Sequence, residues 1–208
     1  YGDRIYKNTS YSWYTTFKSE PPYIGETNNY TGSYRRTIEV PADWKGSDIF
    51  MHVGSATSNL KVWINGKYVG YSEDAKIAAE FNVTKYLKPG KNLIAMQVMR
   101  WCDGSYLEDQ DFWRFTGIAR EAYLYARPKV HVNDITIGQD LVNGYKDGKL
   151  DVTLDIAGGK KALVDIQLVD ASGKVAVEAT GIKGANNLTQ SFTVSNAKAW
   201  TAETPNLY

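Results

Sequence analysis

The sequence predicts an all-β protein with two domains, and three observations lead to this prediction. Short runs rich in β-branched and aromatic residues are separated at close spacing by Gly, Pro, Asn and Asp, and no helical period of ten residues or more interrupts them. The length of 208 residues suits two ordinary domains. The aromatic residues are unevenly spread, with 23 in residues 1–126 and four in residues 127–208. We therefore expect two β domains with different cores.

Residues 1–126 are expected to form an antiparallel sandwich or jelly roll. Its clearest element is a β-hairpin, in which strands 60–64 and 67–71 flank Asn65-Gly66. This dipeptide tolerates the positive φ angles of a type I′ turn better than others do. The remaining strands of the domain are expected at 33–40, 48–53, 80–83, 93–101 and 121–126.

Residues 127–208 are expected to form a second, plainer β-sandwich. Its strands are predicted at 130–137, 149–156, 162–169, 174–179 and 188–194. An immunoglobulin-like sandwich needs about seven strands and about 100 residues. Five strands in 82 residues fall short of this, so we expect the domain to be incomplete at its C-terminus. If the chain ended at Tyr208, its last strand would leave an unpaired edge.

Charge and composition narrow the possible partners. Because 24 Lys and Arg face 23 Asp and Glu, the net charge is +1, and neither nucleic acid nor an anionic membrane is favoured. No stretch approaches the roughly 18 apolar residues of a membrane span. Both a cytoplasmic and a periplasmic location remain open.

The Cys and His content leaves little material for a metal site. A single Cys102 excludes a disulfide within the chain, and two histidines, His52 and His131, leave few ligands for a His-bound metal. His52 falls in a predicted strand among apolar residues, so we interpret it as structural. Cys102 has no Cys or His nearby in the sequence and is expected to be inert.

Residues 101–117 form a segment unlike the rest of the chain, with carboxylates and large aromatic side chains in one predicted loop. These residues are Trp101, Asp103, Tyr106, Glu108, Asp109, Asp111, Phe112 and Trp113. Loops of this length are usually functional or disordered, and the aromatic content argues against disorder. Carboxylates beside aromatic rings suit a sugar, whose hydroxyls need acceptors and whose C–H face packs on a ring.

A structural interpretation of the same segment stays open. The carboxylates could pair with Arg100, Arg114 and Arg120 and hold the loop on the sandwich. A glycosidase needs two carboxyl groups about 5–9.5 Å apart across the scissile bond. Neighbours on one loop can meet that spacing by accident, so the sequence does not predict a complete catalytic pair.

Four blocks of the sequence carry a resemblance to a known family. They are residues 1–11, residues 60–74 with Trp-Ile-Asn-Gly-Lys, residues 100–118 with Tyr-Leu-Glu-Asp-Gln-Asp, and residues 200–208. In these blocks the chain resembles the N-terminal, non-catalytic part of the bacterial beta-galactosidases of glycoside hydrolase family 2. The blocks reach both ends of the chain and run in the family's order.

The resemblance implies a domain order and an activity for a longer protein. A jelly roll with a galactose-binding-like fold, residues 1–126, would precede an immunoglobulin-like domain, residues 127–208. A TIM barrel beyond this sequence would carry the acid/base and nucleophilic glutamates. The parent would be a retaining enzyme that hydrolyses terminal non-reducing beta-D-galactose residues and forms a homo-oligomer. The 208-residue fragment alone is expected to be inactive.

The resemblance also implies two site residues and two metal ions. Asn8 would contact the galactosyl group, and Asp111 would contact the sugar and a sodium ion. The other sodium ligands and the magnesium ligands would lie in the barrel, so the fragment alone is expected to bind no cofactor. Glu108, Asp109 and Arg114 keep the structural interpretation.

Two other functions stay open at this point. The chain could be a stand-alone carbohydrate-binding module that uses the aromatic loop as a platform. It could also be a scaffold that contributes a contact between subunits.

Overall fold

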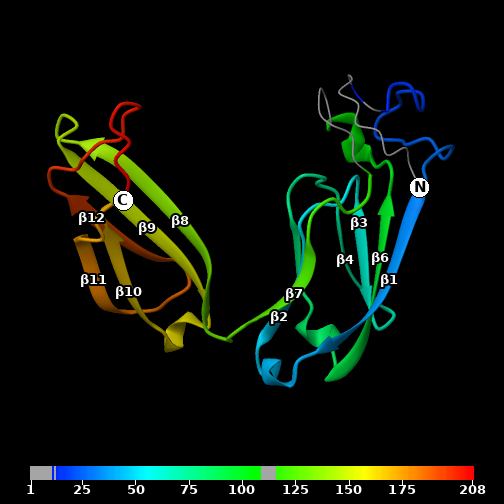
Figure 1. Cartoon of the computed structure of the whole chain (residues 1–208), viewed down its shortest axis with the longest axis horizontal. Coiled ribbons are helices and arrows are strands. Elements are labelled where there is room, and N and C mark those ends of the chain that lie inside the picture. Colours follow the sequence, from blue (N-terminus) through cyan, green and yellow to red (C-terminus); the bar gives the residue numbers. More distant parts are fainter. Residues whose placement is uncertain (1–10, 12, 109–115) are drawn as a thin grey trace. The chain divides into compact units, whose positions relative to one another are not determined.

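The computed structural model describes residues 11, 13–108 and 116–208, and the regular elements among them are β-strands and short 3-10 turns (Figure 1). The predicted all-β class is confirmed. The chain divides into two compact units, Tyr1–Arg127 and Pro128–Tyr208, called here the first and the second unit. No helix among the described residues is long and apolar enough to cross a membrane.

Two antiparallel sheets build the first unit. The strands of one sheet are, in order, β1 (Thr31–Val40), β6 (Gly90–Met99), β3 (Leu60–Ile64) and β4 (Lys67–Ser72). Those of the other are β5 (Ala79–Asn82), β2 (Asp48–Val53) and β7 (Ala122–Arg127). Three 3-10 turns accompany them, namely η1 (Ala42–Trp44), η2 (Thr84–Tyr86) and η3 (Asp103–Tyr106). The predicted strands of this domain are present, with ends that shift by a few residues.

The core of the first unit lies between its two sheets. Every second residue of β2 and of β3 is buried, which is the period expected for a strand with one covered face. The buried cluster combines Ile49, Met51 and Val53 of β2 with Val62 of β3 and Val98 of β6. Because these residues come from both sheets, the unit is a sandwich.

The predicted hairpin is confirmed, and its turn does more than reverse the chain. Asn65 and Gly66 have φ angles of 50° and 79°, as the type I′ turn requires. The Asn65 side chain donates to Asn92 Oδ1 at 2.8 Å and accepts from the Leu93 N–H at 3.0 Å. Asn92, only 1% exposed, in turn donates to the carbonyl oxygens of Lys88 and Gly90 at 2.7 and 2.8 Å. One buried polar network therefore joins two turns.

The second unit also has two sheets, and its five predicted strands are present. One sheet has the order β12 (Leu188–Val194), β9 (Asp147–Ala157), β8 (His131–Val142). The other pairs β10 (Leu163–Val169) with β11 (Val175–Lys183), and η4 (Gly159–Lys161) leads into it. The core consists of alternate β9 residues, Leu150, Val152, Leu154 and Ile156, with apolar side chains from β10 and β12 packed against them.

Two strands of this unit run further than their sequence patterns predict. β8 continues past Gly138 to Val142, because the antiparallel register with β9 holds as far as the pair Val142–Asp147. β11 continues through Gly181, whose φ angle of 66° is available to glycine, as far as Lys183. In both cases strand pairing overrides a local signal for a turn.

Candidate functional site

The two residues predicted to contact sugar, Asn8 and Asp111, lie outside the described residues. The same holds for Asp109, Phe112, Trp113 and Arg114. Their proposed roles stay predictions. The described residues on either side of 109–115 nevertheless define how the acidic-aromatic segment is attached to the sandwich.

The segment begins where β6 ends, and Asn29 holds that point. Asn29 accepts from the Trp101 N–H at 2.9 Å and donates to the Trp101 carbonyl oxygen at 3.2 Å. The Arg100 N–H donates to the Tyr30 carbonyl oxygen at 2.9 Å. The backbone of residues 100 and 101 is therefore tied to the segment that precedes β1, although the partners are 70 and 72 positions apart in the sequence. No local sequence pattern marks Asn29, because its partner Trp101 lies 72 positions away.

Trp101 and Tyr106 belong to an aromatic cluster with Trp13 and Phe17. Phe17 meets both Trp101 and Tyr106 edge to face at 5.8 Å between ring centroids, and Trp13 meets Tyr106 in the same way at 4.9 Å. Such pairs add about 0.5–1.5 kcal/mol each beyond area burial. The cluster thus packs Trp101 and Tyr106, two of the aromatic residues of the acidic-aromatic segment, against Trp13 and Phe17.

Tyr106 also anchors the start of the segment through its hydroxyl group. The hydroxyl donates to the Tyr23 carbonyl oxygen at 2.6 Å and accepts from the Glu20 N–H at 3.1 Å. The η3 turn closes upon itself, since the Cys102 N–H donates to Ser105 Oγ at 3.0 Å. Tyr106 and Ser105 are both buried. Hydrogen bonds and burial therefore hold the chain on the sandwich up to Tyr106.

Both flanks of residues 109–115 are held by hydrogen bonds. On one side, Glu108 Oε1 accepts from the N–H of the buried Ala75 at 3.1 Å. On the other side, Gly117 and Thr57 exchange two backbone hydrogen bonds of 3.0 and 3.1 Å. The Glu108 carboxylate thus holds a neighbouring loop, which supports its structural interpretation.

Two of the arginines proposed as partners of the carboxylates have other contacts. Arg120 donates to the Lys76 carbonyl oxygen at 2.8 Å, and the Arg100 guanidinium lies over the Trp101 ring at 5.2 Å. A backbone acceptor therefore holds Arg120 and an aromatic ring holds Arg100, both at the same end of the sandwich. Arg114 lies outside the described residues.

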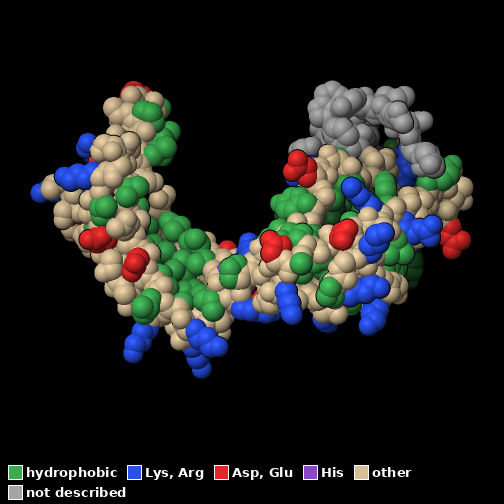
Figure 2. All heavy atoms as spheres, turned by 60° about the horizontal axis from the view of Figure 1, so that its bottom comes forward, with side chains coloured by type: hydrophobic (Ala, Val, Ile, Leu, Met, Phe, Trp, Pro, Cys, Tyr) green, Lys and Arg blue, Asp and Glu red, His purple; other side chains and the backbone are tan. Residues whose placement is uncertain are grey.

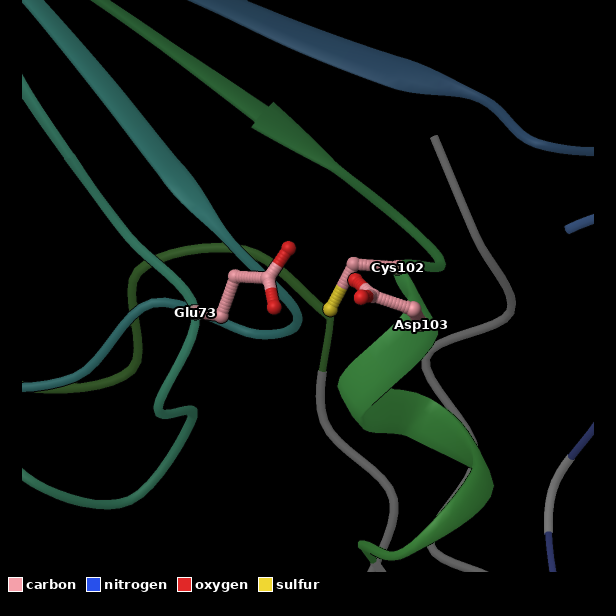
Figure 3. A group of neighbouring side chains, drawn as sticks. All are labelled: Glu73, Cys102 and Asp103. Atoms are coloured by element: carbon pink, nitrogen blue, oxygen red, sulfur yellow. The ribbon is translucent and has the colours of Figure 1, made fainter. Parts of the chain in front are cut away.

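Glu73, Cys102 and Asp103 come together although the sequence separates them. Their ligand atoms all lie within 4.8 Å of one another, and Figure 3 shows the three side chains converging from the loop after β4 and the start of η3. Burial and the neighbouring Asp103 raise the pKa of Glu73, although the hydrogen bond from Tyr71 opposes the rise. Burial raises the pKa of the Tyr71 hydroxyl and that of the Cys102 thiol.

This group does not fit the sodium or magnesium ions that the resemblance implies. Those ions take oxygen ligands, whereas one of the three ligands here is a buried thiol that stays protonated at neutral pH. No local pattern marks Glu73, because 28 intervening residues separate it from Cys102 in the sequence. We describe the group as a polar cluster that packs the β4–β5 loop on η3.

His52 is structural, as predicted. Its Nδ1 lies 3.0 Å from Glu80 Oε1 on the neighbouring strand β5, and its ring stacks on Tyr123 of β7 at 4.6 Å. Glu80 also accepts from the Tyr125 hydroxyl at 3.0 Å. These are cross-strand contacts of the sheet β5-β2-β7, which stabilise the sheet.

Family models match both parts of the chain. Residues 1–128 match the model described as "Glycosyl hydrolases family 2, sugar binding domain", and residues 130–208 match "Glycosyl hydrolases family 2". Together the two matches cover nearly the whole sequence.

Curated relatives agree with these matches. The chain is 40% identical to a beta-galactosidase of Clostridium acetobutylicum over 98% of its own length and 23% of the relative. It is 38% identical to a beta-galactosidase of Priestia megaterium over 98% of its length and 21% of the relative. The chain thus spans about a fifth of the length of the curated relatives it matches.

Solved structures share the fold. A beta-glucuronidase of Bacteroides uniformis superimposes with a TM-score of 0.70 at 26% identity, over 86% of this chain and 23% of that one. A beta-glucuronidase from an uncultured Clostridium superimposes with a TM-score of 0.69 at 21% identity, over 87% of this chain and 32% of that one.

Proposed function

The chain belongs to glycosyl hydrolase family 2, and from that premise we propose that it is the N-terminal part of a longer, retaining beta-galactosidase. The observation that carries this proposal is the identity of 36–40% to proteins named beta-galactosidase over 98–100% of the chain. The parent would hydrolyse terminal non-reducing beta-D-galactose residues, with its catalytic glutamates in a TIM barrel outside this chain. It would act as a homo-oligomer.

In this proposal the first unit supplies one side of the galactosyl-binding subsite. The Asn8 amide offers a donor and an acceptor to a sugar hydroxyl, and the ionised Asp111 offers acceptors to a second hydroxyl. Support comes from the described flanks, since Glu108 and Gly117 are both held by hydrogen bonds to the sandwich. A sugar-contacting residue acts by positioning, and positioning needs firm attachment.

Asp111 would also be one ligand of a sodium ion. A carboxylate oxygen suits a hard cation, but one carboxylate does not complete a coordination shell. The remaining sodium ligands and the magnesium ligands would come from the barrel of the parent. The 208-residue chain alone is accordingly proposed to bind neither ion and to be inactive.

Replacing Asp111 in the full-length parent tests the subsite. We expect Asp111→Ala to lower kcat/KM for an aryl beta-galactoside by about a hundredfold or more, because a misplaced substrate loses near-attack geometry. The sodium dependence of the rate should disappear with it. Asn8→Ala should lower kcat/KM but keep the sodium dependence, because Asn8 is proposed to contact only the sugar.

Asp43→Ala provides the matched control for this experiment. Asp43 is an exposed carboxylate in η1, at the end of the first unit away from η3 (Figure 1), and we expect its loss to leave kcat/KM and the sodium response unchanged. An unchanged sodium response in Asp111→Ala would contradict the metal role. Faster turnover of an aryl beta-glucuronide than of the beta-galactoside would contradict the substrate.

A stand-alone carbohydrate-binding module is the second candidate, favoured by the description "sugar binding domain" of the matching model. Calorimetric titration of the 208-residue chain with galactose and lactose separates the two functions. A chain that supplies only one side of the galactosyl subsite should bind sugar only in the millimolar range or not at all. A complete carbohydrate-binding module should be saturated by sugar well below that concentration. Turnover of an aryl beta-galactoside by the chain itself, abolished by Asp111→Ala, would overturn the proposed inactivity.

A further inference from the structure

The chain contains the dipeptide Asn-Gly twice, and both copies lie in turns between antiparallel strands. Asn65-Gly66 joins β3 to β4, and Asn143-Gly144 lies in the loop that joins β8 to β9 (Figure 1). The φ angles are 50° and 79° at the first turn and 53° and 67° at the second. The two turns therefore share the reactive dipeptide and a left-handed backbone, so a difference between them has to come from their surroundings.

The dipeptide Asn-Gly is chemically labile. The backbone nitrogen of the glycine is able to attack the side-chain carbonyl carbon of the asparagine, and glycine has no Cβ atom that hinders the approach. Asparagine is for this reason counted among the thermolabile residues. In a folded protein the attack depends on how often the turn opens and the asparagine amide is released from its partners.

The fold restrains the Asn65 side chain with three hydrogen bonds. Its amide nitrogen donates to the Tyr86 carbonyl oxygen at 3.0 Å and to Asn92 Oδ1 at 2.8 Å. Its Oδ1 accepts from the Leu93 N–H at 3.0 Å. Asn92 is itself only 1% exposed. Before the Asn65 amide can react, all three hydrogen bonds have to break, and one of them is to a buried partner.

The Asn143 side chain is restrained much less. It is exposed, and among the described residues it has one hydrogen bond, from Nδ2 to Asp147 Oδ2 at 2.8 Å. The loop around it is open, since a Cβ atom added to Gly144 would meet no atom within 4 Å. The next residue, Tyr145, is 78% exposed and has a φ angle of 65°, which is strained for a side chain other than glycine. This turn therefore opens more easily than the turn at Asn65.

We propose that Asn143 is a site of spontaneous deamidation and that the fold protects Asn65 from the same reaction. The Gly144 nitrogen forms a bond to Asn143 Cγ, and the side-chain nitrogen leaves as ammonia with the proton of the Gly144 amide, which gives a cyclic imide. Water then opens the imide. Cleavage at Cγ gives aspartate, whereas cleavage at the main-chain carbonyl carbon gives isoaspartate. The net reaction consumes one water and releases one ammonia, and nothing is oxidised or reduced.

The product would disturb the end of the β8–β9 hairpin. Figure 2 shows both acidic and basic side chains on the surface of the second unit, so one further carboxylate is not unusual there. Asp147 is the sensitive neighbour. The hydrogen bonds from Asn143 and from the Asn196 N–H lower the pKa of Asp147, and a carboxylate at position 143 would replace the first donor with a like charge. Because Asp147 Oδ1 holds the Asn196 N–H at 2.9 Å, the disturbance would reach the residues after β12.

Storage of the 208-residue chain at mildly alkaline pH, followed by peptide mapping with mass spectrometry, tests this proposal independently of the proposed function. We expect aspartate and isoaspartate to accumulate at position 143 at least about tenfold faster than at position 65, because fewer hydrogen bonds have to open. A methyltransferase specific for isoaspartate should label the peptide that contains residue 143. Equal rates at the two positions would overturn the proposal, and so would faster loss of Asn65.

Two controls assign the difference to the fold. In urea both turns lose their restraints, so the two dipeptides should deamidate at similar rates. A difference that persists in urea would come from the local sequence and would overturn the proposed protection. Asn92→Ala removes one partner of the Asn65 amide, so in the folded variant position 65 should deamidate faster while position 143 keeps its rate. An unchanged rate at position 65 in this variant, with its fold verified by circular dichroism, would also contradict the protection.

Discussion

Strands β2 and β8 carry similar alternating apolar patterns but end in different environments. In β2, Ile49, Met51 and Val53 are nearly inaccessible, because a second sheet covers them completely. In β8, Ile135 and Ile137 stay more than half exposed, because the covering sheet stops at β10. The comparison teaches that alternation identifies the face a strand is able to bury, whereas the neighbouring layer decides whether that face is buried.

The largest expected difference between the two units is in the cost of losing an apolar side chain. We expect Leu60→Ala, at a position only 1% exposed, to lower the free energy of unfolding by about 2–5 kcal/mol. Ile137→Ala in the 208-residue chain should cost less than about 1 kcal/mol, because its side chain is half in water. Urea denaturation followed by circular dichroism checks both values. Equal losses of unfolding free energy in the two variants would show that Ile137 contributes as much to stability as the buried Leu60, and would contradict the difference between the two units.

Loss of a buried polar partner should give the next largest effect. Asn92→Ala leaves the Asn65 amide and the Lys88 and Gly90 backbone groups without their buried partners, and we expect a cost of about 1–3 kcal/mol. Ser172→Ala is the control in the second unit, where the hydroxyl donates to Asp170 in an exposed turn. Its cost should stay below about 0.5 kcal/mol. Similar urea midpoints for the two variants would contradict the structural role of the buried network.

The smallest expected effects concern pH, and they have opposite signs in the two units. Burial and Asp103 raise the pKa of Glu73, so the stability of the folded protein falls as the pH rises through that raised value. Hydrogen bonds from Ser191 and Lys149 lower the pKa of Asp151, so its contribution is present above the ordinary pKa of Asp and is lost as the pH falls through the lowered value.

Two amide variants measure these opposite signs. Glu73→Gln should raise the urea midpoint at neutral pH and leave it unchanged well below the ordinary pKa of Glu, where wild-type Glu73 is protonated as well. Asp151→Asn should lower the midpoint slightly at neutral pH and have no effect at acidic pH. A Glu73→Gln midpoint that is lower than wild type at neutral pH would show that the carboxylate stabilises the fold.

Much of the fold could be predicted from local patterns, whereas little of the candidate site could. The Asn65-Gly66 turn and the alternation in β2, β3 and β9 follow from backbone sterics and from a period of two, which neighbouring residues define. The contacts of Asn29 with Trp101 and of Glu73 with Asp103 join segments far apart in the chain. Local periodicity does not predict these contacts, because the loops meet at one end of the sandwich only once the sheets have folded.

The sequence by itself determined the all-β class, the approximate positions of the strands, the Asn65-Gly66 turn and membership of a glycosyl hydrolase family, because these depend on residue types in local order. Only the tertiary structure decided which apolar faces are covered. It also decided that the aromatic residues around Trp101 pack on one another, and that Glu108 holds a neighbouring loop. Burial depends on which layer lies opposite a strand, and that is a property of the assembled sheets.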